Sequence, residues 1–271
     1  MKKFFLFLIL ISFIPMLRGQ TLLFYRGDGP TTAIYSCDVS GGSTFNLSGG
    51  WTHIIHRQNY FQNGASYLFY NSISGLAVTT KDAHENLRDV QTYNLASGWT
   101  HVVQVESANK ILFYNSSTGA AAITGSNIYA TIRNQNLAGG WTHIVPSGNN
   151  ILFYNAKTGA ATLTNISFET ISTHSMAGGW TQIVPTGRGM LFYNSNSGAS
   201  TLTQYNNFRT IETFSFTRGW TQIVNVNSCG NLLFYNTNTG AGQLMNNNFR
   251  VISNHTMAGQ WKIILGITVL L

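Results

Sequence analysis

Residues 139–176 read GGWTHIVPSGNNILFYNAKTGAATLTNISFETISTHSM, and this stretch decides the fold. It contains four short segments rich in apolar and β-branched residues, at 141–145, 151–154, 160–163 and 168–173, separated by Gly, Asn, Ser and Pro. Short runs bounded by such turn residues are typical of β-strands. We therefore predict four consecutive strands, A to D in chain order, and no helix.

Residues 155–159 predict a tight hairpin between strands B and C. The Asn155 side chain can bond to the backbone that follows it, and Gly159 can adopt a positive φ without steric cost. The same Asn-to-Gly turn recurs at 71–75, 115–119, 194–198 and 236–240. Each recurrence marks the same point of a repeated unit.

Two markers repeat through the chain and keep step with each other. Tryptophan recurs at intervals of 48, 42, 39, 40 and 41 residues, and a Leu-Phe-Tyr strand ends 26 to 29 residues before each next tryptophan. The tryptophans are Trp51, Trp99, Trp141, Trp180, Trp220 and Trp261, and the tyrosines are Tyr25, Tyr70, Tyr114, Tyr154, Tyr193 and Tyr235. There are six units.

Four short antiparallel strands in about 40 residues form a blade of a β-propeller. The first unit starts at strand B, residues 22–25, and the last supplies a lone strand A, residues 261–264. Pairing these two pieces would close the ring and remove its free edges. The expected fold is all-β: a six-bladed β-propeller of residues 20–271, closed by a split first and last blade.

Two β-trefoils are the alternative, because a trefoil also uses three units of about 40 residues. No boundary separates the third unit from the fourth, however, and a trefoil gives no reason to begin and end in the middle of a unit. The propeller is therefore the preferred fold.

Residues 1–19 are expected to be a secretory signal peptide. Lys2 and Lys3 precede an apolar run from Phe4 to Ile14 that is too short to span a bilayer, and Gly19 provides a small residue at the cut. We expect a secreted, extracellular protein without membrane insertion. A second apolar stretch, residues 263–271, could be read as a lipid-anchor signal but is short for one.

Charged residues make up only 8% of the chain, against about 25% in an ordinary soluble domain. Without Lys2, Lys3 and Arg18 the formal charge of +7 falls to +4. The remaining bases are dispersed, so the sequence does not favour nucleic acid as a partner. The surplus of Gly and Asn fits a chain with several tight turns in every blade.

Cys37 and Cys229 form a natural disulfide pair in a secreted chain. Cys37 ends strand C of the split blade, and Cys229 lies in the A–B loop of the sixth unit, its neighbour in a closed ring. The bond would tie the N-terminal part of the closing blade to the last complete one. Two separate buried thiols are the alternative.

Three histidines follow Trp-Thr at one position of successive units, His53, His101 and His143, and Gln182 and Gln222 replace them in the next two. Glutamine would be an odd substitute for a metal ligand, so we interpret these residues as structural polar groups near the channel and expect no metal. The inner strands carry no carboxylate, and no calcium, sialidase, nucleophile-elbow or phosphate-loop motif is present. We expect no enzyme, no catalytic residue and no cofactor.

Repeated polar and aromatic residues should gather on one rim, where B–C hairpins and D–A connections share a face. Amides beside aromatic rings suit a neutral sugar, whose hydroxyls form hydrogen bonds while its apolar face packs on the ring. The same residues also serve as core and turn formers. The candidate ligand-binding residues are Trp99, Trp141, Trp180, Trp220, Asn115, Asn155, Asn194 and Asn236.

The order Gly-Gly-Trp, Leu-Phe-[Tyr/Phe] and a turn ending in Gly resembles that of tachylectin-type propeller lectins. The resemblance covers residues 22 to about 264 and implies a secreted sugar-binding protein of innate defence with one shallow site per blade. The chain differs in having six units, shorter blades and no clear Asn-Trp segment in strand D.

Sequons at Asn46, Asn165 and Asn254 are candidate glycosylation sites, and a further sequon, at Asn115, falls in a ligand turn. The leading hypothesis is a multivalent carbohydrate-binding protein whose partners are neutral or N-acetylated glycans on cell surfaces or glycoproteins. The alternative is a secreted structural or protein-binding scaffold, such as a matrix or venom component. The sequence does not indicate an oligomeric state.

Overall fold

The computed structural model describes residues 21–27, 31–57, 66–81, 88–105, 110–125, 129–226, 230–257 and 260–266, and every regular element in these ranges is a strand. The strands of the first half are β1 (Thr21–Tyr25), β2 (Thr31–Ser36), β3 (Gly42–Asn46), β4 (His53–Arg57), β5 (Ser66–Tyr70), β6 (Leu76–Lys81), β7 (Arg88–Asn94), β8 (His101–Val105), β9 (Lys110–Tyr114), β10 (Ala120–Gly125), β11 (Thr131–Asn136) and β12 (His143–Ser147). Those of the second half are β13 (Asn150–Tyr154), β14 (Ala160–Asn165), β15 (Thr170–Ser175), β16 (Gln182–Thr186), β17 (Gly189–Tyr193), β18 (Ala199–Thr203), β19 (Thr210–Ser215), β20 (Gln222–Val226), β21 (Asn231–Tyr235), β22 (Ala241–Asn246), β23 (Val251–Thr256) and β24 (Ile263–Gly266). Within the described ranges no helix is long and apolar enough to cross a bilayer.

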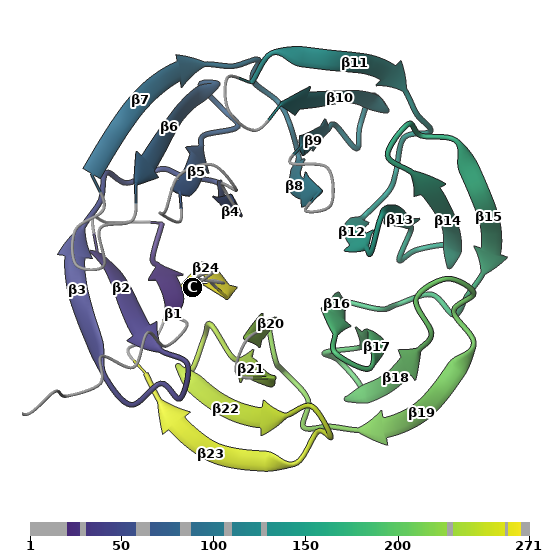
Figure 1. The fold of residues 1–271 in the computed structure, drawn as a ribbon. Coiled ribbons are helices and arrows are strands. Elements are labelled where there is room, and N and C mark those ends of the chain that lie inside the picture. The colour runs from purple at the N-terminus through teal and green to yellow at the C-terminus, as the bar shows by residue number, and fades with distance from the viewer. Residues whose placement is uncertain are drawn as a thin grey trace, which may run out of the picture.

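The strands form six antiparallel four-stranded sheets arranged as a ring, which confirms the six-bladed β-propeller (Figure 1). Blade 1 has the order β24-β1-β2-β3, and blades 2 to 6 are β4–β7, β8–β11, β12–β15, β16–β19 and β20–β23. The A strands lie around the axis and the D strands on the outside (Figure 1).

Blade 1 joins the two ends of the described chain. The register of β1 and β24 pairs Leu23 with Leu265 and Tyr25 with Ile263, so the inner strand of the first blade comes from the last one in the sequence (Figure 1). The closure by a split blade was predicted, and the two-trefoil alternative is wrong.

Strand B is the most deeply buried part of each blade. In blade 4, Leu152 and Tyr154 are fully buried and Phe153 is 2% exposed. Phe153 packs against Trp141 of its own blade at 6.0 Å between ring centroids and against Tyr114 of blade 3 at 6.1 Å. Because the equivalent pairs recur between successive blades, aromatic rings fill the joints of the propeller.

The predicted limits of strands A and D are wrong, since both strands start and end two residues later than predicted. Strand A of blade 4 begins at His143, since Trp141 and Thr142 still belong to the D–A connection. Strand D begins at Thr170, because Phe168 has a φ of +64° and cannot continue an extended strand. The Asn165 side chain holds this turn by accepting hydrogen bonds from the backbone N–H groups of Ser167 and Glu169.

The outer strands of blades 2 to 6 each contain a bulge. In blade 4, Leu163 pairs with Ser172 and Thr164 with Thr170, which leaves Ile171 unpaired. Such bulges twist an edge strand away from pairing with another molecule. Exposed isoleucines occupy this position in four blades: Ile132 (57%), Ile171 (52%), Ile211 (44%) and Ile252 (52%).

Candidate functional site

The B–C turns and the D–A connections meet on one face, as the sequence predicted. In blade 4, the backbone N–H of Gly159 donates to the Asn155 carbonyl at 2.8 Å, and Gly179 of the next connection donates to the Ala156 carbonyl at 2.7 Å. Gly159 has a φ of +76°, and a Cβ there would lie 2.0 Å from the Met176 carbonyl oxygen. The glycine that ends each turn is therefore required by this close approach.

The asparagine side chains of these turns are largely used by the fold. Asn155 donates from Nδ2 to the Gly140 carbonyl at 2.9 Å, and its Oδ1 accepts from the backbone N–H groups of Lys157 and Thr158. One Nδ2 hydrogen remains. Asn71, Asn115 and Asn236 make the same bonds, and Asn194 Oδ1 accepts from the backbone N–H groups of Asn196 and Ser197. A ligand at this rim would meet one unused amide hydrogen in each of blades 2, 3, 4 and 6.

The tryptophans pack on the phenylalanine of their own blade and differ in exposure. Trp99, Trp141 and Trp180 are half-buried, whereas Trp220 is only 7% exposed and Trp261 2%. Among the described residues none of the six indole Nε1 atoms has a hydrogen-bond partner, and those of Trp220 and Trp261 are buried. Of the four candidate tryptophans, Trp220 therefore offers the smallest surface to a ligand.

The tyrosine of strand B links neighbouring blades. The Tyr154 hydroxyl donates to the Ala177 carbonyl of the following connection at 2.8 Å. The Tyr193 hydroxyl donates to the Thr217 carbonyl at 2.8 Å and also accepts from the backbone N–H of Trp220 at 3.2 Å. The Leu-Phe-Tyr marker thus identifies both the core and the bond between one blade and the next.

The His and Gln of strand A perform one structural task. His143 Nε2 lies 3.1 Å from the Thr181 carbonyl of the next blade, and Gln182 Nε2 donates to the Thr221 carbonyl at 2.8 Å. His53, His101 and Gln222 make equivalent bridges. Glutamine can replace histidine at this position because the amide and the imidazole both place a nitrogen within hydrogen-bond distance of a backbone carbonyl of the next blade. In blade 1 the equivalent residue is Ile263, which has no side-chain donor.

Burial lowers the pKa of His53, His101 and His143, which keeps these rings neutral. No group of three or more His, Cys, Asp or Glu able to hold a metal occurs in the described part of the chain. The interpretation of these residues as structural polar groups is thus supported by their contacts.

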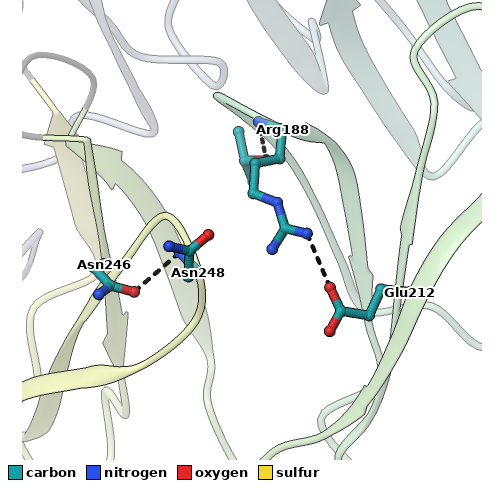
Figure 2. A network of polar contacts seen from close by, with 5 residues as sticks. Arg188, Glu212, Asn246 and Asn248 are labelled. Atoms are coloured by element: carbon teal, nitrogen blue, oxygen red, sulfur yellow. Dashed lines mark hydrogen bonds and ion pairs between the residues drawn. The ribbon is translucent and has the colours of Figure 1, made fainter.

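Three carboxylates of the described residues, those of Asp38, Glu169 and Glu212, make local contacts. Hydrogen bonds from Ser36 and Ser40 hold the pKa of Asp38 at about 2. Glu212 pairs with Arg188 at 3.0 Å across blade 5, beside the turn that contains Asn246 and Asn248 (Figure 2). Asp28, Asp82, Glu85 and Glu106 lie outside the described residues. The inner strands carry no carboxylate, as the sequence indicated.

Arginines beside strand D are exposed. Arg133, at the edge of blade 3, donates from Nη1 to the Ser167 carbonyl of blade 4 at 2.7 Å. Its guanidinium therefore joins two blades.

An aromatic residue in the C–D turn was missed by the sequence analysis. Tyr129, Phe168, Phe208 and Phe249 all have φ between +52° and +64° and are at most 8% exposed. Phe249 packs on Phe214 of the preceding blade at 4.6 Å between ring centroids, and Tyr129 packs on Tyr93 at 4.7 Å. The Asn-x-x-Phe spacing before strand D, at 165–168 and 246–249, is the signal that could have revealed this second contact between blades.

A cavity of about 1180 Å³ opens where the A–B loops surround the axis, on the face opposite the B–C turns. Its walls come from the inner strands β12, β16, β20 and β24 and from the C–D turns of blades 5 and 6. All of the described residues that line it are uncharged. The repeated motifs of the sequence did not reveal this cavity.

No protein-family model and no curated protein match the sequence. A solved protein of unknown function from Desulfotomaculum acetoxidans is similar with a TM-score of 0.65 at 7% identity, covering 92% of this chain and 100% of that one. A chain of a nidogen–laminin complex has a TM-score of 0.62 at 8% identity, with 91% and 98% covered. A candidate 6-phosphogluconolactonase from Bacteroides fragilis has 0.58 at 12%, with 89% and 82% covered.

These similarities show the propeller fold alone. The neighbours have different functions and include a candidate enzyme, so the fold decides neither for nor against catalysis. They are consistent with a propeller and do not single out the tachylectin type. The expected absence of enzymatic activity stays a prediction.

The remaining predicted sites stay untested. Cys37 follows β2 and packs against the cluster between blades 1 and 6, but Cys229 and the signal peptide, residues 1–19, lie outside the described residues. Asn46 and Asn254 are exposed on the outer strands β3 and β23, where a glycan has room. Asn165 is half-buried at the end of β14, and its Nδ2 donates to Glu169 at 2.7 Å.

Proposed function

We propose that this protein is a secreted, multivalent carbohydrate-binding protein that recognises neutral or N-acetylated sugars through its rim. The observation that carries the proposal is the set of half-buried tryptophans whose indole N–H groups have no partner among the described residues. Beside each one lies a turn asparagine with at least one unused amide hydrogen, as at Trp141 and Asn155. An aromatic edge and two neutral donors suit a hydroxyl or acetamido oxygen.

Several weak sites on one rigid ring would act together. Each rim position offers few contacts, so we expect a Kd of about 1 mM for a single sugar. On a glycan-coated surface, simultaneous binding can exceed the single-site affinity by roughly 10² to 10⁴. The half-buried candidate residues Trp99, Trp141 and Trp180 belong to consecutive blades, which suits this mode of binding.

The test combines a glycan array with an agglutination assay. We expect binding to neutral and N-acetylated glycans, and at least a tenfold lower agglutination titre when Trp99, Trp141 and Trp180 are all changed to Phe. Phenylalanine keeps an aromatic ring for packing but removes the indole N–H. Lys157→Ala is the matched control, because Lys157 is exposed in the same rim turn. A blank array, or a triple variant as active as the wild type, would refute the proposal.

A secreted protein-binding scaffold is the second candidate, and the outer strands favour it. Ile132, Ile171, Ile211 and Ile252 expose 44–57% of their surface at one repeated position around the perimeter. Apolar side chains at that exposure suit contact with another protein. A blank glycan array together with self-association or matrix binding that is lost when these four residues become Thr would favour the scaffold.

A further inference from the structure

The cavity on the A–B face combines a shape and a chemistry that the rim does not have. Pro146 and Pro185 line it from β12 and β16, and Gly266 lines it from β24. Its polar groups are mainly side-chain amides, and among the residues that the structure describes no Lys, Arg, His, Asp or Glu lines it. A volume of about 1180 Å³ holds a small molecule together with water. The ligand that fits such walls is uncharged.

Asn225 presents a fixed amide to this cavity. Its Nδ2 donates to the Pro185 carbonyl of the neighbouring blade at 2.7 Å, and no described residue donates to its Oδ1. The bond to Pro185 holds the side chain in one orientation. The free oxygen is therefore placed in advance for a ligand donor, at no further cost in side-chain ordering.

Asn247 is a second held amide, on the C–D turn of blade 6. Its Oδ1 is buried and has no hydrogen-bond partner among the described residues. A Cβ on Gly187 would lie 2.9 Å from its Nδ2, and one on Gly230 would lie 3.1 Å away, so the side chain fits between two loops because both positions are glycine. A buried acceptor without a hydrogen-bond donor is energetically unfavourable unless a ligand or a water molecule donates a hydrogen bond to it.

We propose that the cavity between blades 4 to 6 and β24 is a separate binding site for a small neutral polyhydroxylated molecule, with Asn225 and Asn247 as its principal hydrogen-bonding residues. A hydroxyl both donates and accepts, so it satisfies an amide in either orientation of the side chain. The prolines and the aliphatic residues of the A strands provide the apolar wall for the carbon face of the molecule. This site is single and axial, and it does not depend on the rim.

The test titrates the full protein with myo-inositol and with glucose, and with glucuronate and glucosamine as charged counterparts, observing the side-chain amide signals of Asn225 and Asn247 by NMR. We expect both signals to shift with the neutral probes and not with the charged ones. Asn247→Ala should weaken binding by about threefold to tenfold, the loss of one hydrogen bond. Asn248→Ala is the matched control, since this exposed neighbour lies outside the cavity lining (Figure 2).

Gly187→Ala provides a second variant that removes no polar group, because its new Cβ would displace the Asn247 side chain. It should weaken binding as Asn247→Ala does, while the rim variant Trp141→Phe should leave the amide shifts unchanged. No shift with either neutral probe, equal shifts with the charged probes, or full binding by both cavity variants would overturn the proposal, since the cavity would then hold ordered water only. Loss of rim binding alone would leave these shifts intact.

Discussion

His56 should make the stability of the ring depend on pH. It lies on β4 with its ring 5.6 Å from that of Tyr67, and its Nε2 is buried without a hydrogen-bond partner among the described residues. Burial lowers its pKa from 6.5 to about 4, because the charged imidazolium would lose its hydration and gain no acceptor.

The size and sign of the effect follow from this shift. A difference of about 2.5 pKa units corresponds to about 3 kcal/mol. The unfolded chain takes up the proton near pH 6.5 and the folded chain only near pH 4. Above about pH 6.5 His56 is neutral in both states and does not destabilise the folded chain. As the pH falls from 6.5 to about 4, the free energy of unfolding decreases, and below pH 4 the effect of His56 is constant.

The assay is urea unfolding of the wild type and of His56→Gln at about pH 7.5 and about pH 4. Glutamine is a suitable replacement because Gln104 occupies the same position of blade 3. Between the two pH values the variant should lose about 3 kcal/mol less than the wild type. His53, His101 and His143 titrate in both proteins, so the difference isolates His56. An equal loss in both proteins, or an NMR pKa for His56 above 6, would refute the reasoning.

Four further predictions address the repeats and the closure. Tyr193→Phe should destabilise the protein by about 1–2 kcal/mol in urea unfolding, because the Thr217 carbonyl and the Trp220 N–H both lose a partner; no change would show that water replaces the hydroxyl. Gly159→Ala should cost more than Gly148→Ala by at least about 1 kcal/mol, since both have positive φ but only Gly159 has a carbonyl within 2.0 Å of a new Cβ; equal losses would contradict the close approach. His143→Gln should be nearly neutral above pH 7, whereas His143→Leu should cost about 1 kcal/mol; identical melting of the two would mean that the bridge to Thr181 contributes nothing. Alkylation should add mass to Cys37 and Cys229 only after reduction, and labelling without reductant would exclude the disulfide.

The architecture could be predicted because two markers that repeat in step are the residues that build each joint. Trp141 and Phe153 pack within a blade, and Tyr154 bonds to the next one. Such residues must recur whenever the joint recurs, so their spacing counts the blades. The split closure followed from where the first and last strands fall within the unit.

Strand limits were less predictable, because they depend on backbone conformations that one residue does not reveal. Phe168 reads as a strand residue by composition, and its positive φ arises from the turn held by Asn165 and from burial of the ring against blade 3. At the rim, the sequence indicated which residues meet but not that Asn155 Oδ1 is already used by the turn.

The axial cavity could not be predicted from the sequence, because the residues that line it do not repeat from blade to blade. Its inner-strand position is occupied by Pro146, Pro185, Asn225 and Gly266 in successive blades, so it has no common residue to recognise. A search for repeats selects what is the same in every unit. A site assembled from positions that differ between units is visible only after the ring has brought them together.

The pairing of β1 with β24 also has a consequence for how the protein is made. Leu23 meets Leu265, so nearly the whole described chain is synthesised before the first sheet can be completed. Contacts of such long sequence separation slow folding and leave unpaired edges exposed in the meantime. Blades 2 to 6 consist of contiguous segments and can form as they emerge, whereas the β1–β3 sheet must wait. Ring closure is therefore expected to be the final and slowest step, and the newly made chain is most exposed to misassembly at the inner edge of β1.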